Sequence, residues 1–399
     1  MPRHPEVAPS VAAIPGSVYS RLANRLAQFD GEVYPLHVGD TWMEPAEGCR
    51  MEDLTVAEHP GMHRYAPPQG RPDLLAAIAG RVERRMGVPT TPEEVLVAAG
   101  ATGALGAVAG AILAPGDEVL LLAPYWPLIS GIVRSFHGTP VPVPFLGAAD
   151  SPETAVAAVA ERLTPRTVAL YLNTPNNPTG KVIPPAWIAA LVAWAAAHGL
   201  WILADEVYED YVYLGTHAYS RWLAPERTFS IHSFSKAFGM AGNRCGYVVG
   251  PAATMGELRK ISTHTFYSTP TASQISARRA LGGPGDRWIA AARDAYRSLG
   301  EAAAARLGVS PPEGSTFLFL DVADRLDQRG LEGFLEDCGD RGLFLAPGPS
   351  FGPYPTHVRV CFTAAAPEVV GRGIEILAGQ LGRPGTAAAG AGNQRSSRT

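Results

Sequence analysis

Lysine is scarce in this 399-residue chain and occurs only at Lys181, Lys236 and Lys260. Arginine supplies the rest of the 33 basic residues. A guanidinium stays protonated and cannot form an imine. A chain this poor in lysine that keeps one inside a motif of small residues, as with Lys236 in residues 233–239, therefore indicates a need for an amine at that place.

Paired cysteines, long apolar runs and an excess of basic charge are also missing. The four cysteines form no CxxC pair, which predicts neither a disulfide framework nor a metal site and fits a reducing cytoplasm. The most apolar stretch, 98–114, is short and glycine-rich, which favours a buried helix over a membrane span. The N-terminus lacks the pattern of a secretory signal. A net charge of -4 argues against a nucleic-acid partner, and we interpret the basic run 81–85 as a solvated helix face.

The length and the hydrophobic pattern predict two domains with α/β character. From about residue 95 onward, apolar runs alternate with helical patterns, which is typical of a mainly parallel sheet. Several predicted strands are apolar on both faces, as expected when helices cover both sides. The predicted strands are 95–98, 118–122, 141–144, 167–172, 200–205, 228–233 and 245–249, and the predicted helices are 102–113, 154–163, 185–198 and 251–264.

The pattern changes after a long predicted helix at 286–307. Strands at 316–321 and 357–361 flank helices near 331–341 and 367–380, which predicts a smaller α+β domain. We therefore expect an α/β protein whose large domain has a mainly parallel seven-stranded sheet covered by helices, plus this smaller domain. The expected division is 1–45 as a segment packing with the small domain or a partner subunit, 46–290 as the large domain, 291–382 as the small domain and 383–399 as a disordered tail.

The strongest chemical signal is the motif Ser-Phe-Ser-Lys at residues 233–236, with Arg244 eight residues after Lys236. The motif follows an apolar strand, so it lies at the carboxyl end of that strand, where open α/β sheets bind ligands. Two hydroxyls, an amine and an arginine together suit a ligand that carries a phosphate ester and a carbon able to form an imine. The alternative interpretation is a polar loop with a solvated lysine.

A second segment, Gly-Ala-Thr-Gly at residues 100–103, follows the first predicted strand and opens a helix. Backbone N–H groups at a helix start attract an anion, and Thr102 adds a hydroxyl. Small residues at this place also have a plain structural explanation, since they let a helix approach a strand closely. By itself the segment is weak evidence for a phosphate site.

Two further segments place polar groups at strand ends. Asp205 ends a strongly apolar strand, where its carboxylate can hold the ring nitrogen of a bound pyridine ligand protonated. Tyr208 is placed to contact a phenolic oxygen on the ring of that ligand. Asn177 lies in a loop, 173–180, that two prolines shape. The structural alternatives are a helix N-cap for Asp205 and an ordinary turn for the loop.

These motifs, together with Tyr-Trp at 125–126 and His-Val-Arg-Val at 357–360, occur in an order that closely resembles the class I/II aminotransferases of pyridoxal-5′-phosphate (PLP) fold type I. The resemblance runs from about residue 33 to 380. It implies an enzyme that moves an amino group from an α-amino acid to a 2-oxo acid, with Lys236 binding PLP as a Schiff base and transferring the proton. The catalytic residues that it implies are Lys236, Asp205 and Tyr208.

The resemblance also implies which residues bind the cofactor and the substrate. Arg359 corresponds to the arginine that grips the substrate α-carboxylate, with Asn177 and Gly39 nearby. Tyr65 corresponds to a tyrosine that reaches the phosphate of a neighbouring subunit, which implies a homodimer. The implied cofactor-binding residues are Ala101, Thr102, Trp126, Asn177, Asp205, Tyr208, Ser233, Ser235, Lys236, Arg244 and Tyr65.

Two other functions fit part of the pattern. A β-eliminating PLP lyase of the C–S lyase type would use the same fold, cofactor and proton abstraction. A Rossmann dinucleotide-binding protein would use the glycines that begin at residue 100, but these are spaced GxxGxxG and not GxGxxG. No second arginine is assignable to a side-chain carboxylate, so we expect neutral amino donors to be preferred over aspartate.

Overall fold

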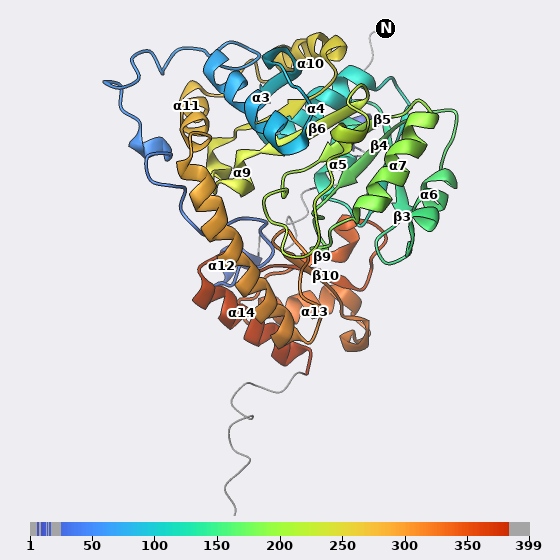
Figure 1. Ribbon diagram of the computed structural model, residues 1–399. Coiled ribbons are helices and arrows are strands. Elements are labelled where there is room, and N and C mark those ends of the chain that lie inside the picture. The colour runs from blue at the N-terminus through green and yellow to red at the C-terminus, as the bar shows by residue number, and fades with distance from the viewer. Residues whose placement is uncertain (1–5, 8, 13, 15, 17–24, 383–399) are drawn as a thin grey trace, which may run out of the picture.

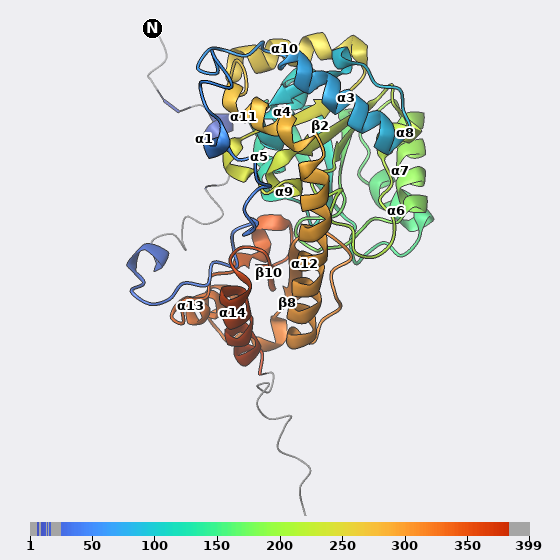
Figure 2. The same cartoon turned by 60° about the vertical axis from the view of Figure 1, so that its left-hand side comes forward.

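The computed structural model describes residues 6–7, 9–12, 14, 16 and 25–382. The expected disordered tail, 383–399, lies outside these residues. Within them, no helix is long and apolar enough to cross a bilayer. Figures 1 and 2 show two parts, a larger one built on a broad sheet and a smaller one that contains α13 (Gly330–Gly339) and α14 (Pro367–Gln380).

The large sheet has seven strands in the order β1-β7-β6-β5-β4-β2-β3. Strand β7 runs antiparallel to β1 and β6, and the remaining neighbours are parallel. This confirms the predicted mainly parallel seven-stranded sheet. The strands are β1 (Val95–Ala98), β2 (Glu118–Ala123), β3 (Thr139–Pro144), β4 (Thr167–Asn173), β5 (Trp201–Asp205), β6 (Thr228–Ser233) and β7 (Gly246–Val249).

Helices cover both faces of this sheet, which explains why its central strands are apolar throughout. One core joins α4, α5 and α10 to one face, and another joins α6 and α7 to the opposite face. Strand β3 carries prolines at positions 140, 142 and 144, a composition that is tolerated because β3 is an edge strand. The helices of this part are α3 (Pro72–Met86), α4 (Gly100–Ile112), α5 (Pro127–Ser135), α6 (Pro152–Ala160), α7 (Pro185–Ala197), α8 (Ser220–Leu223), α9 (Phe234–Ala237), α10 (Ala252–Thr265) and α11 (Thr271–Ala280).

The small sheet is antiparallel, with the order β8-β10-β9. Its strands are β8 (Phe317–Asp321), β9 (Ala346–Pro347) and β10 (His357–Cys361), and α13 and α14 pack with it in one apolar core. The N-terminal segment joins this core through Leu36, whose carbonyl accepts a hydrogen bond from the Cys361 N–H at 2.8 Å. The smaller α+β part therefore has the predicted character.

A single long helix, α12 (Pro284–Leu307), runs from the larger part to the smaller one (Figures 1 and 2). Ile289 packs in a core of the large part, whereas Ala303 and Leu307 pack in the core of the small part. The helix ends at Gly308, whose φ of 64° is the left-handed conformation that commonly closes helices. The proposed division after residue 290 thus falls inside a continuous helix, and the domain limits remain a proposal.

Candidate active site

A cavity of about 260 Å³ lies at the carboxyl ends of β5 and β6 and extends to β10 of the small sheet. This is the edge at which open α/β sheets place ligands. All residues predicted for the site except Tyr65 line it. The lining residues are Gly39, Ala101, Thr102, Trp126, Asn173, Asn177, Asp205, Val207, Tyr208, Ser233, Ser235, Lys236, Ala241, Arg244 and Arg359.

The first turn of α4 and Arg244 together form a positively polarised corner of this cavity. Gly100 has a φ of +72°, and a Cβ atom there would lie 2.7 Å from Nη2 of Arg244, so glycine is needed for both conformation and space. Arg244 itself has a φ of 48°, which is uncommon for a residue with a side chain, and its Nη1 donates to the Ala241 carbonyl at 2.9 Å. Ala101 and Thr102 follow in the helical turn, whose N–H groups favour an anion.

Lys236 lies on the short helix α9, directly after β6. Ser233 caps this helix, because its Oγ accepts the N–H of Ser235 at 3.0 Å. The Lys236 amine donates to the Gly39 carbonyl across the cavity, and its own carbonyl accepts from the Tyr211 hydroxyl at 2.8 Å. Burial lowers the pKa of the Lys236 amine, which increases the fraction in the neutral, nucleophilic form.

Asp205 is a buried carboxyl at the last position of β5. The Tyr171 hydroxyl donates to its Oδ2 at 2.6 Å, the Val207 N–H lies 3.5 Å from its Oδ1, and the Asn173 amide donates to its backbone carbonyl at 3.1 Å. Burial raises the pKa of Asp205 to about 6, and the hydrogen bond from Tyr171 opposes this rise. No α-helix begins at this point, so the alternative role of Asp205 as a helix N-cap has no helix to cap.

Arg359 reaches the cavity from β10 with its planar group fixed from several sides. Its Nη1 donates to Asn177 Oδ1 at 2.9 Å, and its Nη2 donates to the His37 carbonyl at 2.6 Å. The rings of Phe317 and Phe351 lie 4.3 Å and 4.9 Å from its Cζ. A guanidinium with a fixed plane suits two-point recognition of a carboxylate.

Two aromatic side chains complete the cavity wall. Tyr208 is buried and packs edge-on against Phe317, with ring centroids 5.6 Å apart. Burial raises the pKa of the Tyr208 phenol, so it stays a neutral hydrogen-bond donor at physiological pH. Trp126 stands at the start of α5 and is half-buried, leaving ring surface available for stacking.

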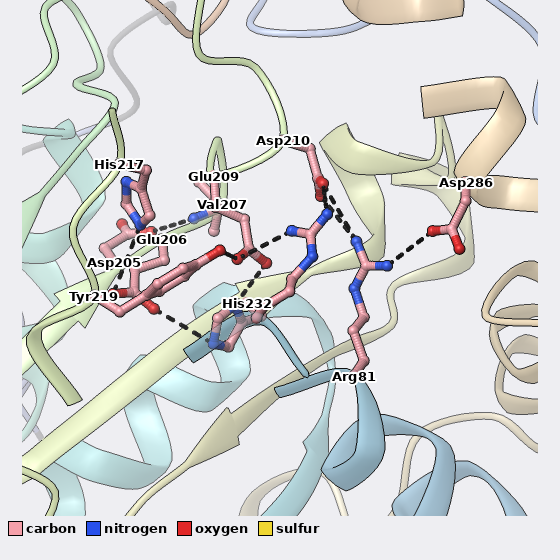
Figure 3. Close-up of polar contacts among 11 residues, drawn as sticks. Arg81, Asp205, Glu206, Val207, Glu209, Asp210, His217, Tyr219, His232 and Asp286 are labelled. Carbon is pink, nitrogen blue, oxygen red and sulfur yellow. Dashed lines mark hydrogen bonds and ion pairs between the residues drawn. The ribbon is translucent and has the colours of Figure 1, made fainter. Parts of the chain in front are cut away.

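A buried network of charges connects α3 with the loop after β5 and with β6 (Figure 3). Arg81 Nη2 lies 3.2 Å from Asp210 Oδ2, Arg85 also contacts Asp210, and Arg85 Nη1 lies 3.2 Å from Glu209 Oε2. Glu209 in turn accepts from His232 at 3.0 Å, one residue before the end of β6. The interpretation of the 81–85 run as a solvated face was therefore wrong for Arg81, which is 6% exposed. Its charge is paired with Asp210 on the loop after β5 and with Asp286 on α12.

Tyr65 is the one predicted site residue that the single chain leaves outside the cavity. Its side chain is 85% exposed and meets the ring of Tyr267, with centroids 5.0 Å apart. It lies in a separate surface hollow with Arg64 and Arg71. The segment between η1 (Met51–Asp53) and α3 loops outward on this side of the large sheet (Figure 1).

Three residues that line the cavity were not predicted as site residues, namely Asn173, Val207 and Ala241. Of the three, Asn173 could most readily have been predicted from the sequence, because it is a polar residue directly after a predicted apolar strand. Its Oδ1 accepts the Asn177 N–H at 2.8 Å, so it joins the loop after β4 to the end of β5. In the described ranges, no group of three or more His, Cys, Asp or Glu side chains is placed to hold a metal ion.

Comparison with known proteins gives one consistent result. The family model described as aminotransferase class I and II matches residues 36–377. A probable aspartate/prephenate aminotransferase of Thermus aquaticus is 36% identical over 76% of this chain and 80% of its own length. An arginine–pyruvate transaminase of Pseudomonas aeruginosa is 34% identical over 86% of this chain and 88% of its own length.

Solved structures agree with the sequence relatives. A single mutant of Thermus thermophilus aspartate aminotransferase superposes with a TM-score of 0.86 at 30% identity, covering 94% of this chain and 100% of its own. The N-succinyldiaminopimelate aminotransferase of Mycobacterium tuberculosis gives a TM-score of 0.84 at 27% identity, again over 94% of this chain and 100% of its own. With the family match spanning most of the described residues, the chain belongs to the class I and II aminotransferases.

Proposed function

We propose that this aminotransferase works with PLP held by Lys236, and that the cavity passes the amino group from an α-amino acid to a 2-oxo acid. The observation that carries the proposal is that a buried amine, Lys236, and a buried carboxyl, Asp205, line one cavity beside an anion-binding corner. PLP has an aldehyde, a basic ring nitrogen and a phosphate. The cavity offers a chemically matched group for each, so the residues fit the cofactor.

The side chains divide the work by their chemistry. When bound, PLP supplies an electrophilic carbonyl and an electron-accepting ring. Ionised Asp205 would hold the ring nitrogen protonated, and the neutral Tyr208 phenol and the Asn177 amide would donate toward the ring oxygen. The Lys236 amine would take the proton from the substrate Cα and return it, which is general base and acid chemistry at one nitrogen.

The anion corner has enough donors for a phosphate. The start of α4 contributes backbone N–H groups and Arg244 a fixed guanidinium. Side-chain and backbone groups of this kind hold phosphates in many proteins. The residues assigned to the phosphate are Ala101, Thr102, Ser233, Ser235 and Arg244.

The covalent assignment is tested by borohydride reduction of the protein with bound PLP, followed by peptide mapping. Label is expected on the peptide that contains Lys236, and Lys236→Ala should lose both the label and turnover while still binding PLP non-covalently. Lys260→Ala is the matched control, because Lys260 pairs only with Glu257 at the surface and should not change labelling. Turnover close to normal in Lys236→Ala would refute the proposal.

We further propose that neutral amino acids are the better donors. The relatives carry the names of different substrates, including aspartate, prephenate and arginine, so family membership leaves the donor open. Among the cavity-lining residues the cations are Lys236, Arg244 and Arg359. The proposed cofactor and α-carboxylate would engage all three, which leaves no further cation among the described cavity-lining residues for a second carboxylate.

Steady-state kcat/KM for alanine, leucine, phenylalanine and aspartate tests this donor preference. The neutral donors should exceed aspartate, and Arg359→Lys should raise KM for every donor with PLP binding unchanged, because a lysine loses the two-point grip. If aspartate leads by about tenfold, equivalent to about 1.4 kcal/mol, the donor proposal fails and a cation from a neighbouring subunit becomes the explanation.

A further inference from the structure

Tyr171 is a phenol at a position where packing alone requires only an apolar side chain. It lies in the middle of β4, is fully buried, and is opposite Leu121 of β2 and Leu203 of β5. Its other neighbours in the core are apolar residues of the same sheet face. A buried hydroxyl in such surroundings is unfavourable unless it is hydrogen-bonded, so the hydroxyl is explained by its partner and not by packing.

That partner is the carboxyl of Asp205. Tyr171 pairs with Leu203, and Asn173 pairs with Asp205, so Tyr171 and Asp205 lie on the same face two positions apart along adjacent strands. The phenol reaches along the strand direction and donates to Oδ2 at 2.6 Å. This length falls in the range of a charge-assisted bond from a hydroxyl to an ionised carboxylate.

We propose that Tyr171 is a positioning residue for the reaction, because it holds Asp205 ionised and oriented with Oδ2 occupied, leaving Oδ1 for the ring nitrogen of the cofactor. Oδ1 has only a long contact with the Val207 N–H, at 3.5 Å. Tyr171 does not itself line the cavity, so it acts through Asp205. The inference rests on the proposed function, since it concerns the residue assigned to the PLP ring.

The phenol counteracts what burial does to Asp205. Burial raises the pKa of Asp205, and the bond from Tyr171 lowers it. Other charged and titratable groups also face this carboxyl, namely Glu206 and Tyr208 from the loop after β5 and His232 from β6. These groups stay in place when the Tyr171 hydroxyl alone is removed, so a change in the pH response can be assigned to that hydroxyl.

The test is the binding of PLP to the apoprotein between pH 5 and 8, measured by absorbance and equilibrium dialysis. In the unaltered protein, PLP affinity should fall as the pH drops through the region where Asp205 gains its proton. Tyr171→Phe should move this midpoint upward by about one pH unit, as expected for losing a hydrogen bond to a charged group. PLP binding should therefore weaken by about tenfold at pH 5 and by about twofold at pH 7.

Tyr213→Phe is the matched control. Tyr213 is also a buried phenol, but its hydroxyl donates to the Ser315 carbonyl at 2.6 Å, and it makes no contact with Asp205. Both variants should lose similar thermal stability, whereas only Tyr171→Phe should shift the pH midpoint. If the two variants leave the midpoint and the PLP affinity equally unchanged, Tyr171 is a packing residue and the proposal is wrong.

A double variant protects the test against a folding failure. If Tyr171 acts through Asp205, adding Tyr171→Phe to Asp205→Asn should cause no further loss of PLP affinity. A Tyr171→Phe chain that folds only when Asp205→Asn is also present would support the proposal, and failure of both to fold would overturn it. If PLP does not bind to the unaltered protein, the proposed function has failed, which is a separate and distinguishable result.

Discussion

Asp205, which we propose holds the cofactor ring nitrogen protonated, is unfavourable for the stability of the fold. Its folded-state pKa is about 6, above the ordinary value of 3.8, because the carboxyl is buried. A carboxyl whose pKa is raised by folding is bound to more protons in the folded state than in the unfolded state. Its contribution therefore destabilises the fold progressively as the pH rises from about 4 to 6 and remains constant above that range.

We predict that Asp205→Asn makes the apoprotein more stable at neutral pH and much less active. Removing the buried charge should raise the free energy of unfolding by up to about 3 kcal/mol at pH 7. The loss of the partner for a protonated ring nitrogen should cost about a hundredfold or more in rate. Urea unfolding of both apoproteins at pH 4 and pH 7, with assays of the holoenzymes, measures both effects.

The pH dependence is the internal control for this prediction. At pH 4 the Asp205 carboxyl is protonated in the folded state, so the stability advantage of Asp205→Asn should nearly disappear. A variant that keeps full turnover and gains no stability at pH 7 would mean that Asp205 has no electrostatic role at this site.

At the scale of single elements, the start of α4 depends on one glycine. Gly100 holds a positive φ and allows the guanidinium of Arg244 to approach the helix N-terminus. Gly106 lies in the interior of the same helix, and a Cβ there would make an ordinary 3.7 Å contact with Phe136. The two glycines thus provide a matched pair in one helix, because an alanine substitution should disturb the site at Gly100 and leave it unchanged at Gly106.

We predict that Gly100→Ala displaces Arg244 and weakens PLP binding by at least about tenfold, because the new side chain adds backbone strain of about 1–3 kcal/mol and collides with the guanidinium. Gly106→Ala should leave PLP affinity unchanged and stabilise the chain by about 0.5–1 kcal/mol. Fluorescence titration with PLP measures the affinity of both variants, and thermal unfolding measures their stability. Equal PLP affinity in the two variants would exclude the anion role of this helix start.

The sequence predicted the strands of the large sheet well, because buried parallel strands appear in a sequence as continuous apolar runs. The strands at 95–98 and 228–233 have the predicted limits, and the others differ by one or two residues at an end. The helices α5, α8, α9 and α11 were not predicted, and α3 was anticipated only in the interpretation of 81–85 as a helix face. Helix α3 has seven buried residues, including Arg81, whose charged side chain obscures the apolar face in the sequence.

The predicted residues that line the cavity come largely from motifs at strand ends, since parallel strands bring their carboxyl ends to one edge. Contacts made across strands were not predictable in the same way. Tyr171 resembles any apolar strand residue in sequence, and only the register of β4 with β5 brings it to Asp205. The pairing of Arg81 with Asp210 joins residues 129 positions apart, a separation that no local pattern encodes.

At the scale of the whole molecule, one cavity is built from both parts of the chain. Lys236 and Asp205 come from the large sheet, whereas Arg359 comes from the small sheet and Gly39 from the N-terminal segment that packs on it. Helix α12 connects the two parts as a continuous rod (Figure 2). Under the proposed function, the substrate carboxylate and the reacting amine would be held by different parts, so substrate binding would depend on how the two parts are placed.

The exposed position of Tyr65 indicates contact with a second copy of the chain. Tyr65 and Tyr267 are large aromatic side chains that are 85% and 45% exposed, and Val56 in the same outward segment is 61% exposed. The rings of Tyr65 and Tyr267 lie against each other, and exposed aromatic side chains that lie together favour an interface. We therefore propose that the active form is a homodimer in which Tyr65 of one subunit completes the phosphate site of the other, since twofold assemblies are the commonest kind.

Subunit mixing tests this proposal directly. Tyr65→Phe should weaken PLP binding by about tenfold through the loss of one hydrogen bond to a charged group. A hybrid of Lys236→Ala and Tyr65→Phe subunits contains one intact site, because the lysine comes from one subunit and the tyrosine from the other, so mixing should restore part of the PLP affinity and turnover. Mixing Lys236→Ala with a subunit that carries both substitutions is the control, since no intact site can form. An active monomer by light scattering at the assay concentration, or no recovery beyond that control, would show that each chain builds its site alone.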